Sequence, residues 1–165
     1  MKKLKIMVYN GPNLDKLGGR DTENYGILTL AMINEKLREI AEEENCEIDF
    51  FQTNHVGRLN DAIMLDYTQG TDGILINPAA WTHDGGLQIL DALLLKGKEE
   101  GERFPYVEVH LSDIDERGKD EKEKFRQFSY FKDTAIATIQ GLREHSYYEG
   151  LRVLIKYLRD KEKSA

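Results

Sequence analysis

The sequence predicts an α/β protein with a flavodoxin-like fold: a doubly wound, five-stranded parallel sheet in the order 2-1-3-4-5, with helices on both faces. Two observations predict it. Short apolar runs of strand length alternate with segments whose apolar residues recur at helical spacing, a pattern typical of a parallel sheet covered by helices. No internal repeat or linker interrupts the 165 residues, so we expect one domain over 1–165. Right-handed crossovers then favour the doubly wound strand order.

Each expected element follows from its local pattern. Five segments combine apolar content with strand length, the last of them weakly: 4–9, 46–52, 73–76, 106–111 and 134–140. Four segments place apolar residues on one helical face: 30–41, 56–67, 87–97 and 151–158. Thr29 is expected to cap the first helix. The charged insertion 115–124 is expected to be a solvated loop that leads into a helical turn.

Composition excludes several classes of protein. The net charge is −7 and no basic stripe is present, so nucleic-acid binding is disfavoured, although local arginines could still bind an anion. Cys46 is the only cysteine, which fits a reducing compartment. The apolar run after Lys2 and Lys3 is too short for a signal peptide or a membrane span. We therefore expect a cytoplasmic protein with no membrane or nucleic-acid partner.

Polar side chains follow the expected strand ends, where ligands bind in open parallel sheets, at the switch point between strands 1 and 3. Three of the four histidines and the only tryptophan are among them. These residues are Asn10 and Asn13 after strand 1, Thr53, Asn54 and His55 after strand 2, Asn77, Pro78, Trp81, Thr82 and His83 after strand 3, and His110, Ser112 and Asp113 at strand 4.

Glu108, His110 and Ser112 alternate along one strand, which places them on one face of the sheet. A buried glutamate and histidine are costly unless they are paired. One reading is a general acid supported by an adjacent carboxylate, and the other is a satisfied core histidine. The segment 77–83 is likewise either part of the site or only a capped turn between a strand and a helix.

The loop at 14–26 is long and polar, with Arg20 and Tyr25 five residues apart among glycines. Loops of this length in compact domains are usually functional or disordered. A tyrosine is roughly 0.1% ionised at pH 7, and a cation about 4 Å away could stabilise its phenolate by up to roughly 4 kcal/mol. We therefore interpret 14–26 as a lid that carries a phenolate base.

Known cofactor patterns are missing from the sequence. The three histidines at strand ends include no pair spaced for metal binding on one helix, and no Cys/His cluster is present. Neither a dinucleotide fingerprint nor a phosphate-binding Walker loop occurs. We expect a site without a metal ion or an organic cofactor.

These residues together resemble type II 3-dehydroquinate dehydratase. Five motifs occur in the family's order over about residues 6–142. Three features depart from the family pattern. Asp21-Thr22 replaces Glu-Pro in the lid, the segment 113–125 is longer, and the family's ending Gly-Leu-Gly-x-x-Gly-Tyr is only partly kept at 141–143. The motifs are Asn-Gly-Pro-Asn-Leu with the lid at 10–26, Gln-Thr-Asn-His-Val-Gly at 52–57, Asn-Pro-Ala-Ala-Trp-Thr-His at 77–83, Glu-Val-His-Leu-Ser-Asp at 108–113 and Phe-Arg-Gln-Phe-Ser at 125–129.

The resemblance implies anti elimination of water from 3-dehydroquinate, through an enolate, to give 3-dehydroshikimate. It implies Tyr25 as base, Arg20 as its activator, His110 with Glu108 as general acid, and Asn13 as holder of the water that stabilises the enolate. It also implies a homo-oligomer, a dodecamer of trimers. The implied substrate-binding residues are Asn77, His83, Leu111, Ser112 and Arg126, with Asp91 and Arg117 as further candidates.

Two other functions stay open. The altered lid suggests a non-catalytic paralogue that binds a small ligand or acts as a scaffold after losing turnover. A flavin carrier or phosphoacceptor of the same fold is poorer, because strand 1 ends without an acidic pair or a Ser/Thr-rich phosphate loop.

Overall fold

A computed structural model of the chain describes residues 2–19, 23, 27–99 and 104–164. Its strands form one sheet in the order β2-β1-β3-β4-β5, and all neighbouring pairs are parallel. The predicted strand order is confirmed. The strands are β1 (Leu4–Asn10), β2 (Cys46–Gln52), β3 (Gly73–Asn77), β4 (Tyr106–His110) and β5 (Ala137–Gln140).

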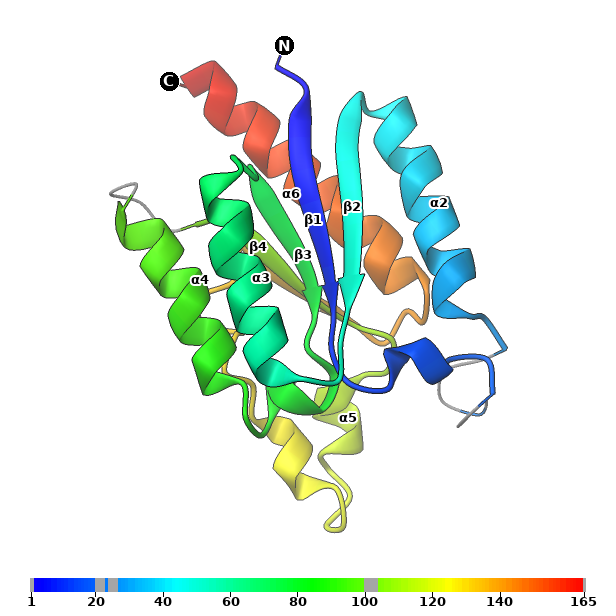
Figure 1. The fold of residues 1–165 in the computed structure, drawn as a ribbon. Coiled ribbons are helices and arrows are strands. Elements are labelled where there is room, and N and C mark those ends of the chain that lie inside the picture. The colour runs from blue at the N-terminus through cyan, green and yellow to red at the C-terminus, as the bar shows by residue number, and fades with distance from the viewer. Residues whose placement is uncertain (1, 20–22, 24–26, 100–103, 165) are drawn as a thin grey trace.

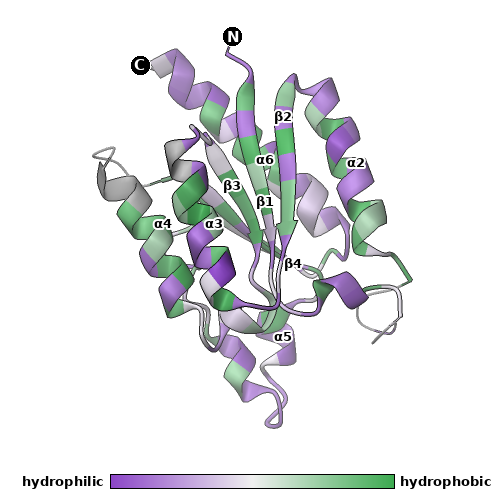
Figure 2. Ribbon diagram, in the orientation of Figure 1, coloured by the Kyte–Doolittle hydropathy of each residue, from purple (hydrophilic) through white to green (hydrophobic). Residues whose placement is uncertain are grey.

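Helices cover both faces of this sheet (Figure 1). One face packs against α2 and α6, the other against α3 and α4, and each interface forms its own hydrophobic core. Figure 2 shows the apolar residues of these helices mainly on the sides that meet the sheet. The helices are α2 (Leu30–Glu43), α3 (Val56–Thr68), α4 (Leu87–Glu99), the four-residue α5 (Ile114–Arg117) and α6 (His145–Ser164).

Most predicted elements lie where expected, with two differences. Strand β5 begins at Ala137 rather than at Thr134, because the backbone N–H groups of Thr134 and Ala135 bond back to the carbonyl of Phe131 in a turn. The segment 115–124, predicted as a solvated loop that leads into a helical turn, does end at a 3-10 helix (Lys124–Gln127), but it also begins with the helical turn α5. The Asp113 side chain caps this turn by accepting from the N–H of Glu116, and Ile114 is buried beneath it.

A glycine allows the carboxyl ends of β1 and β3 to meet. The N–H of Gly11 donates to the carbonyl of Asn77 at 2.8 Å. A Cβ atom at Gly11 would lie only 2.3 Å from the carbonyl oxygen of Pro78. Only glycine therefore lets the two turns, one after each strand, pack this closely.

The chain termini lie at the opposite end of the sheet from these turns (Figure 1). Within the part of the chain that the structure describes, no helix has both the length and the apolar character needed to cross a membrane.

Candidate active site

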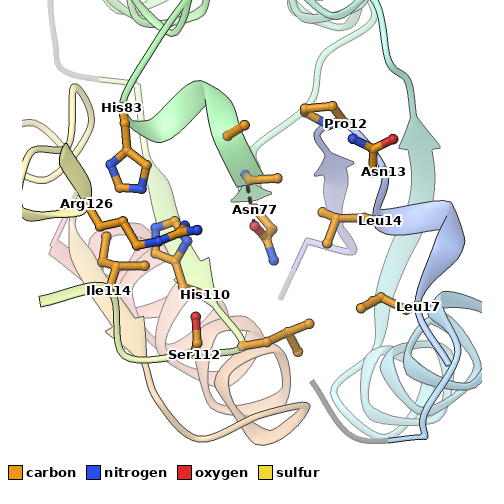
Figure 3. Close-up of a pocket in the computed structure, with 13 residues that line it drawn as sticks. Pro12, Asn13, Leu14, Leu17, Asn77, His83, His110, Ser112, Ile114 and Arg126 are labelled. Atoms are coloured by element: carbon orange, nitrogen blue, oxygen red, sulfur yellow. Dashed lines mark hydrogen bonds between the residues drawn. The ribbon is translucent and has the colours of Figure 1, made fainter. Parts of the chain in front are cut away.

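A cavity of about 150 Å³ opens at the carboxyl ends of β1, β3 and β4 (Figure 3). The turn after β1, the segment after β3, the end of β4 and the segment after α5 all contribute to its wall. Seven of its lining residues were expected at the site from the sequence: Asn13, Asn77, His83, His110, Leu111, Ser112 and Arg126.

Strand β4 contributes a buried hydrogen-bond partner to His110. Glu108 Oε1 lies 2.9 Å from His110 Nε2, and Glu108 is 0% exposed. The same carboxylate accepts from Ser129 Oγ at 2.8 Å and from Thr138 Oγ1 at 3.1 Å. Because a carboxylate accepts, Nε2 of the imidazole donates to it, which leaves Nδ1 as the ring nitrogen available to a ligand. The predicted pairing on one face of the strand is confirmed, and His110 also lines a cavity.

The turn after β1 holds Asn13 at the mouth of the cavity. Its backbone is left-handed, with φ 63°, a conformation that asparagine tolerates better than most residues. Asn54, after β2, accepts from the N–H of Asn13 at 2.8 Å. Gln52 donates to the carbonyl of Gly11 at 3.2 Å and to Asn54 Oδ1 at 3.1 Å. The turn after β2 therefore supports the turn that lines the cavity.

His83 lies on the same side of the cavity as His110 and Arg126, across from Asn13 (Figure 3). Its Nδ1 lies 2.6 Å from the carbonyl oxygen of Phe128. Since a carbonyl only accepts, Nδ1 carries the proton, and in the neutral ring Nε2 is an acceptor. Burial lowers the pKa of His83, against the opposing effect of the Phe128 carbonyl. A neutral His83 could accept a hydrogen bond from a ligand hydroxyl.

Two arginines meet at Glu123 beside the cavity. Arg117 donates to both oxygens of the Glu123 carboxylate, from Nε to Oε2 at 2.9 Å and from Nη2 to Oε1 at 3.0 Å. Arg126 Nε also donates to Oε2, at 2.8 Å. The hydrogen bond from Arg117 is the main cause of the lowered pKa of Glu123. Arg117 Nη1 also lies 3.3 Å from Ser112 Oγ. This trio of side chains carries two guanidinium groups and one carboxylate, a local combination that suits an anionic ligand.

Some expected site residues lie elsewhere. Asp91 is exposed on α4 and His55 is exposed after β2, and neither lines the cavity. Arg20 and Tyr25, the proposed activator and base, lie outside the described residues. The expected lid 14–26 begins with a short 3-10 helix (Leu14–Lys16), and Leu14 is buried in the core below it.

Comparison with known proteins identifies the family of the chain. A sequence profile described as "Dehydroquinase class II" matches residues 4–155 of the chain. The chain belongs to the class II dehydroquinase family. The resemblance inferred from five motifs is thus confirmed over nearly the whole chain.

Individual relatives support the same family assignment. A protein of Geotalea daltonii named 3-dehydroquinate dehydratase is 44% identical over 156 residues, which cover 94% of this chain and 99% of the relative. One of Bordetella avium with the same name is 41% identical, covering 92% and 97%. Among solved structures, the type II dehydroquinase of Butyrivibrio crossotus has 34% identity and a TM-score of 0.81, covering 92% of this chain and 97% of that one.

The structure also brings to the dehydroquinase site residues that the sequence analysis missed. Tyr147 on α6 bonds to Asn77 from behind the cavity. It occupies the tyrosine position of the family's Gly-Leu-Gly-x-x-Gly-Tyr ending, a signal that could have found it. Ser129 closes the Phe-Arg-x-x-Ser motif and could also have been found. Glu123 and Thr138 carry no comparable signal, because one lies in the long insertion and the other on the weakest strand.

Proposed function

We propose that this chain is a 3-dehydroquinate dehydratase of the shikimate pathway, which forms 3-dehydroshikimate by anti elimination of water. The observation that carries the proposal is the buried Glu108–His110 pair, which opens into a cavity at the carboxyl edge of the sheet. A proton donor in such a cavity suits a reaction in which a hydroxyl group must leave. Membership of the class II dehydroquinase family supports the same reaction.

The reaction divides between two proton transfers. In our proposal Tyr25, as phenolate beside Arg20, removes a proton from C2, next to the C3 ketone, and the electron pair moves into an enolate. Asn13 holds the water that stabilises the enolate oxygen. His110 then gives a proton to the C1 hydroxyl, the C1–O bond breaks, the C1–C2 double bond forms, and water departs. The contacts around Glu108 support its role in holding the imidazole of His110 in place.

The polar groups of the wall suit the rest of the substrate. We assign the substrate carboxylate to Ser112 and the backbone near Leu111, where Arg117 adds positive charge 3.3 Å from Ser112 Oγ. We assign the ring hydroxyls to His83 and Arg126, which lie at the far side of the cavity from Asn13. Asn77, between the two sides, would orient the end that loses water.

The proposal extends to the assembly and the location of the protein. A dodecamer built from trimers follows from the family resemblance, and a cytoplasmic location from the single cysteine. Asp91 is exposed and away from the cavity of its own chain, so its proposed contact with substrate requires a neighbouring subunit.

Purified protein mixed with 3-dehydroquinate tests the function. The expected result is a rising absorbance of the conjugated enone, whereas the ketone substrate has no such chromophore. Protein that binds the substrate but produces no enone would overturn the proposal in favour of the non-catalytic paralogue.

A further inference from the structure

A buried row of three polar side chains lies directly behind the cavity wall. Tyr147, from α6, donates its hydroxyl proton to Asn10 Oδ1 at 2.6 Å and accepts from Asn77 Nδ2 at 2.8 Å. The exposed fractions of Tyr147, Asn10 and Asn77 are 0%, 1% and 3%. Of the three, only Asn77 lines the cavity. The row therefore joins the interior of the protein to one point on the cavity wall.

The direction of these hydrogen bonds is determined by the backbone. Asn77 Oδ1 accepts from the N–H of Ala79 at 3.1 Å, the bond drawn in Figure 3. A backbone N–H only donates, so the oxygen of the Asn77 carboxamide faces Ala79 and its nitrogen faces Tyr147. The hydroxyl of Tyr147 must then accept from Asn77 and give its own proton to Asn10. Burial raises the pKa of Tyr147, which keeps that proton in place.

The packing of α6 brings the phenol to this point. A Cβ atom at Gly150 would lie 2.6 Å from Val109 Cγ1 and 2.9 Å from Leu75 Cδ1, so the glycine lets α6 lie close to β3 and β4. At the start of the helix, Ser146 Oγ accepts from the N–H of Leu142 at 3.1 Å. The packing of α6 and the bond at its start therefore hold Tyr147 in place.

The cost of this arrangement suggests that it serves the site. Asn10 Nδ2 is buried without a hydrogen-bond partner among the described residues. An unsatisfied buried group costs about 1–3 kcal/mol, which an apolar side chain at this position would avoid. Stability alone does not account for a polar row here, whereas a fixed carboxamide on the cavity wall does.

We infer that Tyr147 is a positioning residue, which holds the Asn77 carboxamide in the orientation that binds the reacting end of the substrate. The inference rests on the proposed dehydratase function. Without the hydroxyl, the Asn77 nitrogen loses its partner, and only the bond from the N–H of Ala79 still restrains the carboxamide. Misplacing a substrate-binding group by about 1 Å can cost up to about 100-fold in rate.

A double-mutant cycle tests the inference. Steady-state kinetics with 3-dehydroquinate are measured for wild type, Tyr147→Phe, Asn77→Ala and the double variant, with unfolding midpoints recorded for each. The matched control is Tyr148→Phe, the same change one residue later, in a tyrosine whose ring contacts His145 instead. Affinity for the product 3-dehydroshikimate is measured in the same set.

The expected result is a loss of about 10-fold in kcat/KM for Tyr147→Phe, mostly in kcat. In the Asn77→Ala background, the same change should alter kcat/KM by less than about twofold, because its effect passes through Asn77. Tyr148→Phe should match wild type. If Tyr147→Phe does not fold, Asn10→Ala replaces it in the cycle, and its effect should likewise vanish without Asn77.

Two outcomes would overturn the inference. One is a Tyr147→Phe protein with wild-type kinetics and product affinity. The other is an equal loss with and without Asn77, which would indicate general destabilisation rather than positioning. Failure of the proposed function looks different, since wild type would then bind product with the same coupling but give no turnover.

Discussion

Glu108 Oε1 lies 2.9 Å from His110 Nε2, and the glutamate has no exposed surface. Ser129 and Thr138 donate to the same carboxylate, so its position is set by three side chains from three segments. A buried carboxylate that accepts a hydrogen bond from an imidazole orients the ring and stabilises the imidazolium form. The pair is therefore built to present one nitrogen of His110 to the cavity.

Replacing Glu108 by glutamine should lower kcat, because the imidazolium loses its neutralising partner while the shape is kept. General acids contribute about 100-fold to 10,000-fold, so His110→Ala should lose about that much and Glu108→Gln a part of it. Ser129→Ala, which removes one hydrogen bond to the carboxylate, is the control and should lose less. Stopped-flow or steady-state enone absorbance measures all three. A Glu108→Gln enzyme with wild-type kcat would contradict the role of the pair.

The proposed base gives a second prediction. Tyr25→Phe removes the hydroxyl group and keeps the ring, so turnover should fall below about 1% of wild type, in keeping with the scale of general base catalysis. Binding of 3-dehydroshikimate should stay measurable by calorimetry, because the described cavity wall is unchanged. Near-wild-type turnover would show that another group removes the proton.

A third prediction concerns the turn that brings β1 and β3 together. Gly11→Ala places a methyl group 2.3 Å from the carbonyl oxygen of Pro78, so the two turns must separate. Urea denaturation should show a loss of about 1–3 kcal/mol in the free energy of unfolding. Gly57→Ala is the matched control, since a Cβ there meets no atom within 4 Å, and it should cause no loss. Equal stability of the two variants would refute this account of the turn.

The pH dependence of stability gives a fourth prediction. Burial lowers the folded-state pKa of His83, while in the unfolded chain its pKa stays at about 6.5. Below about pH 6.5 the unfolded chain binds a proton that the folded protein does not, so the free energy of unfolding decreases as the pH is lowered. His83→Asn, which can still donate to the Phe128 carbonyl, should show a shallower fall in unfolding free energy between pH 7 and pH 5.5. An identical slope in both proteins would refute it.

Much of the fold could be predicted because the β1 and β3 segments carry short apolar runs typical of buried parallel strands, and they alternate with segments of helical periodicity. Strand β5 was less clear, since the β-branched side chain of Thr134 favours a strand, but the backbone N–H of this residue bonds back to Phe131 in a turn. That choice depends on tertiary contacts such as the bond from Ile136 N–H to the Tyr106 carbonyl. Local propensity does not contain such information.

The site was predictable where its residues follow strands and not where it depends on packing. His110 and Asn77 stand at strand ends, and the period of a strand places Glu108 beside His110. Tyr147 reaches the site from the last helix, 70 residues after Asn77. No local pattern links these two positions, because the contact depends on how α6 lies across the sheet.

The central claim, that this cavity dehydrates 3-dehydroquinate by anti elimination, is tested most directly with substrate that carries one deuterium at C2, anti to the C1 hydroxyl. The account predicts that the purified protein forms the enone and that the product contains no deuterium. Deuterium retained in the enone, or the absence of any enone, would contradict it.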